Sequence, residues 1–202
     1  MTQEHGLERV HEPKGWHSRG YLPHFDGGDV PQLVTSRLAD SFPQKRLLLW
    51  RDELVHLSEQ VANRERMKRI EEYLDTGAGS AHLRDARIAH IVEQNMLYFD
   101  NDRYRIHAWV VMPNHVHALL TPCGEYSLSS IVHSWKSFTA KAANRILQRT
   151  GEFWQPDYFD RYIRDERHFA AAVAYVEGNP TRAGLCKRND EWPFSSARFS
   201  HE

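Results

Sequence analysis

The sequence predicts an α+β fold in which helices pack on an antiparallel sheet. Two β-rich runs at residues 104–112 and 115–121 flank Pro113-Asn114, a dipeptide typical of a tight turn between strands. An amphipathic helix is expected after them, over residues 127–149. The chain of 202 residues, 41% hydrophobic and 26% charged, is long enough to bury a core around these elements.

The first part of the chain changes from irregular structure to strand and then to helix. Residues 1–29 are rich in Gly, Pro, His and charge, which predicts an irregular N-terminal arm. Residues 30–38 are apolar and β-branched, and Pro31 is tolerated because it stands near the start of the expected strand. Apolar residues at helical spacing predict one or two helices over residues 44–75, and Asp85 is expected to cap a further helix.

The last predicted elements are a short strand and a helix. Residues 159–164 predict the strand. Asp165 is expected to cap a helix that runs to about Gly178. We expect Asn179-Pro180 to stop this helix, because the residue before a proline avoids the helical conformation.

The elements follow the order βαββαβ, which is typical of a ferredoxin-like antiparallel sheet with helices packed on it. The helices of about 44–100 exceed this pattern and predict a helical insertion after the first strand. The charged run at residues 63–75 is interpreted as a solvated helical face. We therefore expect a single domain over residues 30–198.

Charge and cysteine content indicate the compartment. A net charge of -1 gives no global positive field, although a local basic track remains possible. Cys123 and Cys186 lie far apart and form no metal-type pair, which indicates a reducing compartment. The N-terminus carries acids without an apolar run, and no apolar run is long enough to span a bilayer. We expect a cytoplasmic protein with no membrane partner.

The sharpest local motif is His115-Val116-His117. On a strand, both histidines point to the same face while Val116 points to the other. Two imidazoles side by side on a rigid strand can bind one divalent metal. Two ordinary polar residues on a half-exposed face would give the same pattern, and His-x-His also occurs in zinc hydrolases.

Tyr175 and Asn179 fall one turn apart on the last predicted helix. The amide oxygen of Asn179 suits a hard cation, whereas a core tyrosine followed by an Asn-Pro stop is the alternative interpretation. A metal held by His115, His117 and Asn179 would bring Tyr175 beside it. Tyr175 could then attack a phosphodiester whose charge the metal offsets.

A basic stretch offers a surface for nucleic acid. No acid occurs between Glu125 and Glu152, and Lys141 and Arg145 fall on one face of the intervening helix. Such a face can follow phosphates, and a solvated helix surface would look the same. The candidate DNA-contacting residues are the basic side chains Arg37, Lys136, Lys141, Arg145, Arg161, Arg164 and Arg182.

Several longer segments occur in a fixed order: GWHSRGYLPHFDGGDVPQLVTSRL, WVVMPNHVHALL, SWKSFTAKAANR, FWQPDYFDRYIRDERHF, YVEGNPTRAGL and WPFSSAR. Together they resemble the REP-associated tyrosine transposases. These proteins are relatives of the single-strand transposases of small bacterial insertion sequences, within the HUH (His-hydrophobe-His) endonuclease group. The resemblance covers roughly residues 15–37 and 104–198.

The resemblance implies a role for each residue of the motifs. His115 and His117 match the metal-binding histidines, Val116 the hydrophobe, Asn179 the third metal ligand and Tyr175 the nucleophile. It also implies Mg²⁺ or Mn²⁺ as the cofactor and single-stranded or hairpin DNA of palindromic repeats as the partner, bound by a monomer or homodimer at the nucleoid. The implied activity is DNA cleavage and strand transfer through a covalent 5′-phosphotyrosine.

Two other functions stay open at this point. A domesticated, sequence-specific DNA-binding protein would keep hairpin recognition without transposition. A zinc hydrolase would use His115 and His117 together with His107 or His133, although the motif lacks the nearby carboxylate base that such sites use.

Overall fold

The main sheet is formed by four antiparallel strands in the order β4-β5-β3-β6. A computed structural model describes residues 15–18 and 23–199 of the chain. The strands are β3 (Gln32–Arg37), β4 (Tyr104–Val111), β5 (His115–Pro122) and β6 (Phe159–Tyr162). The first and third of them along the chain are central, as in a βαββαβ ferredoxin-like sheet. The predicted α+β fold class is confirmed.

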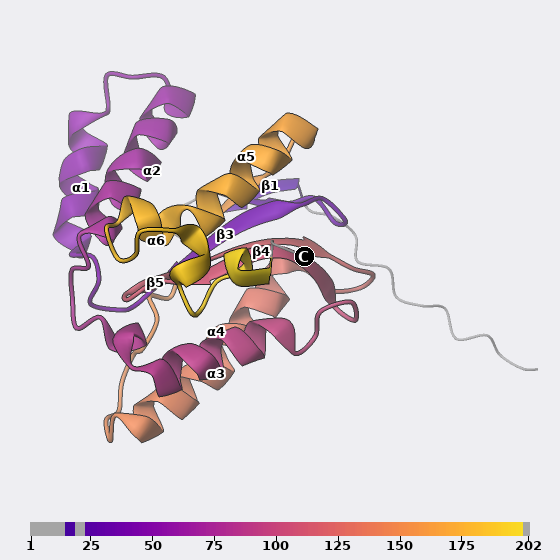
Figure 1. The fold of residues 1–202 in the computed structure, drawn as a ribbon. Helices are drawn as coiled ribbons and strands as arrows, with labels where there is room; N and C mark the ends of the chain where they lie inside the picture. Colours follow the sequence, from indigo (N-terminus) through magenta and orange to yellow (C-terminus); the bar gives the residue numbers. More distant parts are fainter. Residues whose placement is uncertain (1–14, 19–22, 200–202) are drawn as a thin grey trace, which may run out of the picture.

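Helices cover both faces of this sheet (Figure 1). In the described region they are α1 (Gln44–Glu53), α2 (Glu59–Asp75), η1 (His82–Arg84), α3 (Ala86–Leu97), α4 (Leu128–Ile146), α5 (Glu166–Glu177), α6 (Asn179–Arg182), η2 (Asn189–Glu191) and η3 (Ser196–Phe199). Helices α3 and α4 lie against one face, and α5 lies against the other. None of these helices combines the length and the apolar character needed to cross a membrane.

The alternation of β5 determines where the histidines lie. Its even-numbered side chains, such as Ala118, are buried against α3 and α4. Leu119 instead belongs to a second buried cluster with Val176 of α5. Because successive side chains on a strand point to opposite faces, His115 and His117 lie on the Leu119 side, which α5 covers.

The N-terminal arm is more regular than its composition predicts. β1 (Gly15–Ser18) and β2 (Pro23–Asp26) form a two-stranded antiparallel sheet. The prediction of an irregular arm over residues 1–29 is therefore wrong for these two segments. Gly- and Pro-rich composition marks turns but does not reveal that two short segments pair with each other. Residues 1–14 and 19–22 lie outside the described residues.

Residues 44–100 contain helices of two kinds. α3 packs against α4 on the sheet and takes the place of the first helix of the βαββαβ pattern. Its predicted cap is confirmed, because the Asp85 carboxylate accepts the backbone N–H of Arg87 at 3.0 Å. The helices that exceed the pattern are α1 and α2, which stand beside α5 and α6 (Figure 1).

The predicted end of the helix at about Gly178 is confirmed, but the chain does not leave the helical path at Asn179-Pro180 as predicted. α5 ends at Glu177, and α6 continues from Asn179 with Pro180 in its first turn, where the missing N–H has no helical partner to lose. Gly178 between them keeps a right-handed conformation with φ -81° and ψ -3°. The helical path therefore holds Tyr175 and Asn179 one turn apart.

His24 of β2 joins the N-terminal hairpin to the segment around β6. Its ring is buried, with Nδ1 bonded to the Asp160 carboxylate and Nε2 2.8 Å from Asp157 Oδ1. Burial disfavours the charged ring, but the hydrogen bonds and charges of Asp157 and Asp160 outweigh it and raise the pKa of His24 to about 9.

The folded state binds the proton of His24 more tightly than the unfolded chain does, so protonated His24 stabilises the fold. We predict that this stabilisation is fully present below about pH 6.5 and is lost as the pH rises through about 9. The raised pKa corresponds to a contribution on the order of 3 kcal/mol. Thermal unfolding of wild type and His24→Gln should differ strongly near pH 6 and weakly near pH 10. A difference in unfolding temperature between the two proteins that does not depend on pH would contradict the stabilisation by protonated His24.

Candidate functional site

His115 and His117 face each other on β5. Their Nε2 atoms lie 3.1 Å apart, and both residues are 1% exposed. Burial lowers the pKa of His115 to about 3. Burial, together with the neighbouring positive charges, lowers the pKa of His117 well below its usual range. Both rings are therefore neutral near pH 7, which is the form that binds a metal.

Two polar neighbours fix the orientation of these rings. Asn114 Oδ1 lies 2.7 Å from His115 Nδ1, and Thr35 Oγ1 lies 2.7 Å from His117 Nδ1. Because an amide oxygen only accepts hydrogen bonds, His115 Nδ1 donates and its Nε2 keeps a lone pair. Thr35 stands directly opposite His117 in the β3–β5 pairing. Partners of this kind on the second ring nitrogen are typical of metal-binding histidines.

Tyr175 of α5 packs against this pair. Its ring centroid lies 5.2 Å from that of His117, with the planes at 73°. The guanidinium carbon of Arg182 lies 4.3 Å from the centroid of the Tyr175 ring, and its Nη2 donates to the Tyr175 carbonyl at 3.2 Å. Burial, followed by the negative charge of Glu71, raises the pKa of Tyr175 well above its ordinary value. The hydroxyl is therefore protonated at neutral pH.

Asn179 at the start of α6 is fully buried. Within the described part of the chain, neither its Oδ1 nor its Nδ2 has a hydrogen-bond partner. An unpaired buried polar group costs about 1–3 kcal/mol, so this amide fits a position that a ligand completes. Two imidazole nitrogens and one amide oxygen form a donor set that a divalent cation can use.

Five of the predicted DNA-contacting cations are exposed. Arg161 and Arg182 lie close enough to the site for their charges to lower the pKa of His117. Lys141 and Arg145 are exposed on α4, and Arg164 is exposed just after β6. The structure therefore brings two of these residues to the histidine pair and places two on a helix that covers the other face of the sheet.

Arg37 and Lys136 do not lie on an exposed basic surface, which corrects the prediction. Arg37 is 4% exposed, and its guanidinium carbon lies 5.1 Å from the ring centroids of both Phe42 and Phe159. Lys136 Nζ donates to the Pro156 carbonyl at 2.7 Å. Burial lowers the pKa of Lys136 to about 8 and that of Arg37 to about 10. Phe159 and Pro156 lie far from Arg37 and Lys136 in the sequence, so the sequence did not reveal these contacts.

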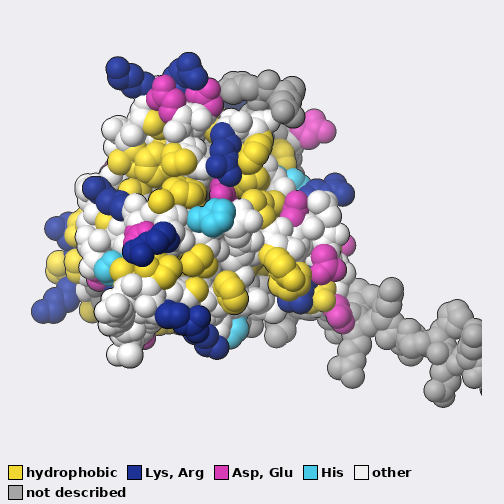
Figure 2. Space-filling view, turned by 60° about the horizontal axis from the view of Figure 1, so that its bottom comes forward, with side chains coloured by type: hydrophobic (Ala, Val, Ile, Leu, Met, Phe, Trp, Pro, Cys, Tyr) yellow, Lys and Arg dark blue, Asp and Glu magenta, His cyan; other side chains and the backbone are white. Residues whose placement is uncertain are grey.

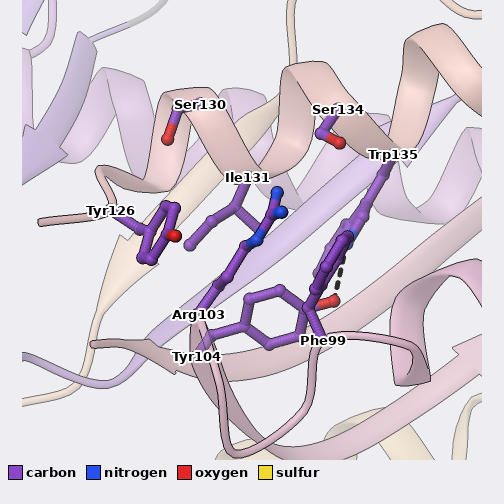
Figure 3. Close-up of a pocket in the computed structure, with 8 residues that line it drawn as sticks. All are labelled: Phe99, Arg103, Tyr104, Tyr126, Ser130, Ile131, Ser134 and Trp135. Atoms are coloured by element: carbon purple, nitrogen blue, oxygen red, sulfur yellow. Dashed lines mark hydrogen bonds between the residues drawn. The ribbon is translucent and has the colours of Figure 1, made fainter. Parts of the chain in front are cut away.

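The α3–α4 face carries a separate cavity of about 150 Å³. In this cavity Arg103 lies with its guanidinium carbon 3.4 Å from the ring centroid of Phe99 and 5.2 Å from that of Tyr126 (Figure 3). None of the residues predicted to be functional lines it. Figure 2 shows this side of the molecule, where Lys and Arg side chains are scattered among hydrophobic ones. The predicted catalytic residues thus gather on the opposite, α5 side of the sheet.

The further histidines that a zinc hydrolase would need are not brought to the pair. His107 Nε2 bonds with Thr121 Oγ1 at 2.8 Å, and His133 is exposed on α4. Across residues 15–18 and 23–199, no group of three or more His, Cys, Asp or Glu side chains is arranged to hold a metal ion. The arrangement therefore disfavours a zinc hydrolase.

Three residues at the site were missed from the sequence. Asn114 was interpreted only as part of a turn, although its position next to His115 was an available signal. Glu71 stood in a run interpreted as a solvated face, yet Ile70 and Leu74 of that run are each 1% exposed, so one side of α2 is buried. Thr35 had no signal, because its role depends on the pairing of two distant strands.

Comparison with known proteins finds a similarity to one family of transposases. Residues 84–179 match the family model described as Transposase IS200 like. The matched segment contains both histidines, Tyr175 and Asn179. This part of the chain is therefore similar to the IS200-like transposases.

The predicted resemblance to the REP-associated tyrosine transposases is confirmed. One such protein of Escherichia coli (strain K12) is 31% identical over 94 residues, which are 46% of this chain and 54% of that protein. The chain thus spans about half the length of the curated relative it matches. A solved structure of a REP-associated tyrosine transposase bound to a REP hairpin aligns with a TM-score of 0.55. The alignment covers 91% of this chain and 82% of the other at 19% identity, and it shows a shared fold.

Proposed function

We propose that the protein is an HUH-type DNA endonuclease and strand transferase that acts on single-stranded hairpin DNA. The observation that supports this most directly is the convergence of His115 Nε2 and His117 Nε2, 3.1 Å apart, next to the ring of Tyr175. A pair of neutral imidazoles in contact with a phenol suits metal-assisted attack on a phosphodiester. The relation to IS200-like transposases supplies the DNA context.

In the proposed reaction, the hydroxyl oxygen of Tyr175 attacks the phosphorus of the scissile phosphodiester. The new O–P bond joins Tyr175 to the 5′-phosphate, the P–O3′ bond breaks, and the 3′ oxygen leaves as a hydroxyl after taking up a proton. The phosphotyrosine retains the energy of the broken bond. A 3′-hydroxyl of another strand can then attack the same phosphorus and release Tyr175 with its proton restored.

His115, His117 and Asn179 are the residues that would hold the divalent cation, Mg²⁺ or Mn²⁺. When bound, the cation supplies positive charge that offsets the charge developing on the phosphate. Arg161 and Arg182 would contact DNA phosphates next to the scissile bond, because both are exposed at the edge of the site.

We propose hairpins of palindromic repeats as the substrate, in line with the related structure bound to a REP hairpin. The presence of Tyr175 and of both histidines favours an active enzyme over a domesticated DNA-binding protein. A protein that acts on chromosomal palindromes would work in the cytoplasm, at the nucleoid.

The substrate proposal predicts that single-stranded DNA able to form a hairpin binds more tightly than a perfect duplex of the same sequence. Changing Lys141 and Arg145 to Ala should weaken hairpin binding and flatten the slope of log K against log salt by about 1.4, for two lost phosphate contacts. The matched control is Lys68→Ala with Arg87→Ala, which removes two exposed cations from α2 and α3. Equal affinity for hairpin and duplex in a titration would refute the proposed substrate.

A further inference from the structure

We propose that the cavity on the α3–α4 face binds a single unpaired pyrimidine base of the DNA hairpin. This inference rests on the proposed function and names the feature of the substrate that the protein recognises. His115, His117 and Tyr175 lie on the α5 side of the sheet, whereas the cavity lies on the other side. The base bound there is therefore separate from the scissile nucleotide, and the cavity serves to recognise the hairpin.

The size and the lining of the cavity fit one six-membered aromatic ring. The cavity has a volume of about 150 Å³, and an apolar protein cavity of about this volume accommodates benzene. Four of the side chains that line it are aromatic, namely Phe99, Tyr104, Tyr126 and Trp135. A pyrimidine base consists of one six-membered ring, whereas a purine has two fused rings. The volume therefore favours a pyrimidine.

Arg103 supplies a polar donor inside this aromatic lining. Figure 3 shows its guanidinium pointing toward α4, and the guanidinium carbon lies 3.4 Å from the ring centroid of Phe99 and 5.2 Å from that of Tyr126. Within the described residues, the buried Nε donates no hydrogen bond, and Asp102 Oδ2 is 3.9 Å away. Pyrimidine bases carry a ring carbonyl that accepts such a bond, and they stack on guanidinium planes. The unpaired donor thus fits a position that a base completes.

The aromatic wall of the cavity is held in place before any base binds. Trp135 Nε1 donates to the Tyr104 hydroxyl at 3.0 Å, and this hydroxyl donates to the Met96 carbonyl at 2.8 Å. The opposite rim is accessible, because Ser130 is exposed and Ser134 is half-buried on α4. A base that swings out of a DNA strand can therefore enter from the α4 side.

One face of α4 connects this rim with exposed cations. Ser134, Phe138, Lys141 and Arg145 follow one another at spacings of four, three and four residues, so they share a face of the helix. Phe138 is 57% exposed, and Lys141 and Arg145 are exposed as well. An exposed aromatic ring beside cations is the arrangement that binds single strands, through base stacking and phosphate contacts.

The distances along this face match a short stretch of DNA. At 1.5 Å per residue, Lys141 and Arg145 stand about 10 Å and 16 Å beyond Ser134 along the helix axis. Successive nucleotides of one strand rise by about 3.4 Å. A strand that leaves the cavity along α4 therefore passes both cations within about three to five nucleotides. The occupant that fits is a DNA strand whose unpaired pyrimidine lies this close to the phosphates that the two cations contact.

The first test compares a hairpin that has one unpaired thymine with the same hairpin that has an abasic site there, which keeps the phosphate and removes the base. Wild type should bind the thymine hairpin about 5- to 150-fold more tightly, the range for one stacked base. An unpaired adenine should give little of this gain. Tyr126→Ala removes one wall of the cavity, and Ser134→Phe fills the cavity from α4, so each variant should bind both hairpins alike. Phe199→Ala removes an aromatic side chain that is 59% exposed outside the cavity, and it should keep the wild-type preference.

A second measurement needs neither a hairpin nor cleavage. A DNA pentamer that carries one 5-iodouracil is irradiated with the protein, and the cross-linked residue is located by mass spectrometry. We expect cross-links at Phe99, Tyr126 or Trp135, in the tryptic peptides 88–103 and 106–136. If wild type binds no hairpin, the proposed substrate fails, while the cross-link still decides whether the cavity binds a pyrimidine. Equal affinity of wild type for the thymine and abasic hairpins, or cross-links confined to residues outside the cavity, would overturn the inference.

Discussion

Replacing Tyr175 by Phe should abolish covalent adduct formation with hairpin DNA and leave the fold intact. The ring keeps its packing against His117, so only the attacking oxygen is lost. Because only one hydroxyl group is removed, the free energy of unfolding should change by about 1 kcal/mol or less. Adduct formation is measured as a denaturation-resistant band, and stability by denaturant unfolding.

Tyr162→Phe is the matched control for this change. Tyr162 is half-buried on β6, with its ring centroid 4.6 Å from that of Phe25, and it lies outside the contacts of the histidine pair. Its variant should form the adduct at the wild-type rate. Residual adduct in Tyr175→Phe would mean that another residue attacks the phosphorus.

Replacing His117 by Ala should lower DNA cleavage by about 10³-fold, because the loss of a cation ligand removes several kcal/mol of charge stabilisation. His115→Ala should have a similar effect. Removal of divalent ions with EDTA should likewise stop cleavage by wild type, and Mg²⁺ or Mn²⁺ should restore it. His117→Ala also leaves the Thr35 hydroxyl without its ring partner, so a loss of stability of about 1–3 kcal/mol is expected.

His107→Ala is the control for His117→Ala, because it removes a histidine that is not proposed to bind the cation. His107 bonds with Thr121 on the neighbouring strand, and its ring centroid lies 5.0 Å from that of Phe169. Its variant should cleave hairpin DNA at nearly the wild-type rate. Cleavage by His117→Ala at the wild-type rate would remove that residue from the metal site.

Features that depend on local backbone geometry could be predicted from the sequence. The period of two in β5 predicts that His115 and His117 share a face, and the structure confirms it with Nε2 atoms 3.1 Å apart. Helical spacing likewise predicts that Tyr175 and Asn179 stand one turn apart. The turn at Pro113-Asn114 and the cap at Asp85 follow from the same kind of short-range rule.

Features that depend on long-range packing could not be predicted. Thr35 reaches His117 only through the pairing of β3 with β5, which are separated by more than one helix along the chain. The charge of Glu71 comes near enough to raise the pKa of Tyr175 because α2 packs on Phe159 of β6. Arg37 is buried partly for the same reason, since Phe159, one of its two aromatic partners, belongs to β6.

The central claim is that the oxygen of Tyr175 becomes bonded to the 5′-phosphate of the cleaved DNA. The adduct can be trimmed with nuclease, digested with trypsin and analysed by mass spectrometry. The digest separates Tyr175 from its two nearest tyrosines in the sequence. Tyr158 falls in peptide 150–161, Tyr162 in peptide 162–164 and Tyr175 in peptide 168–182. We predict a nucleotide 5′-phosphate on peptide 168–182 alone, at its single tyrosine. The same modification on either of the other peptides, with 168–182 unmodified, would contradict the assignment of Tyr175 as the nucleophile.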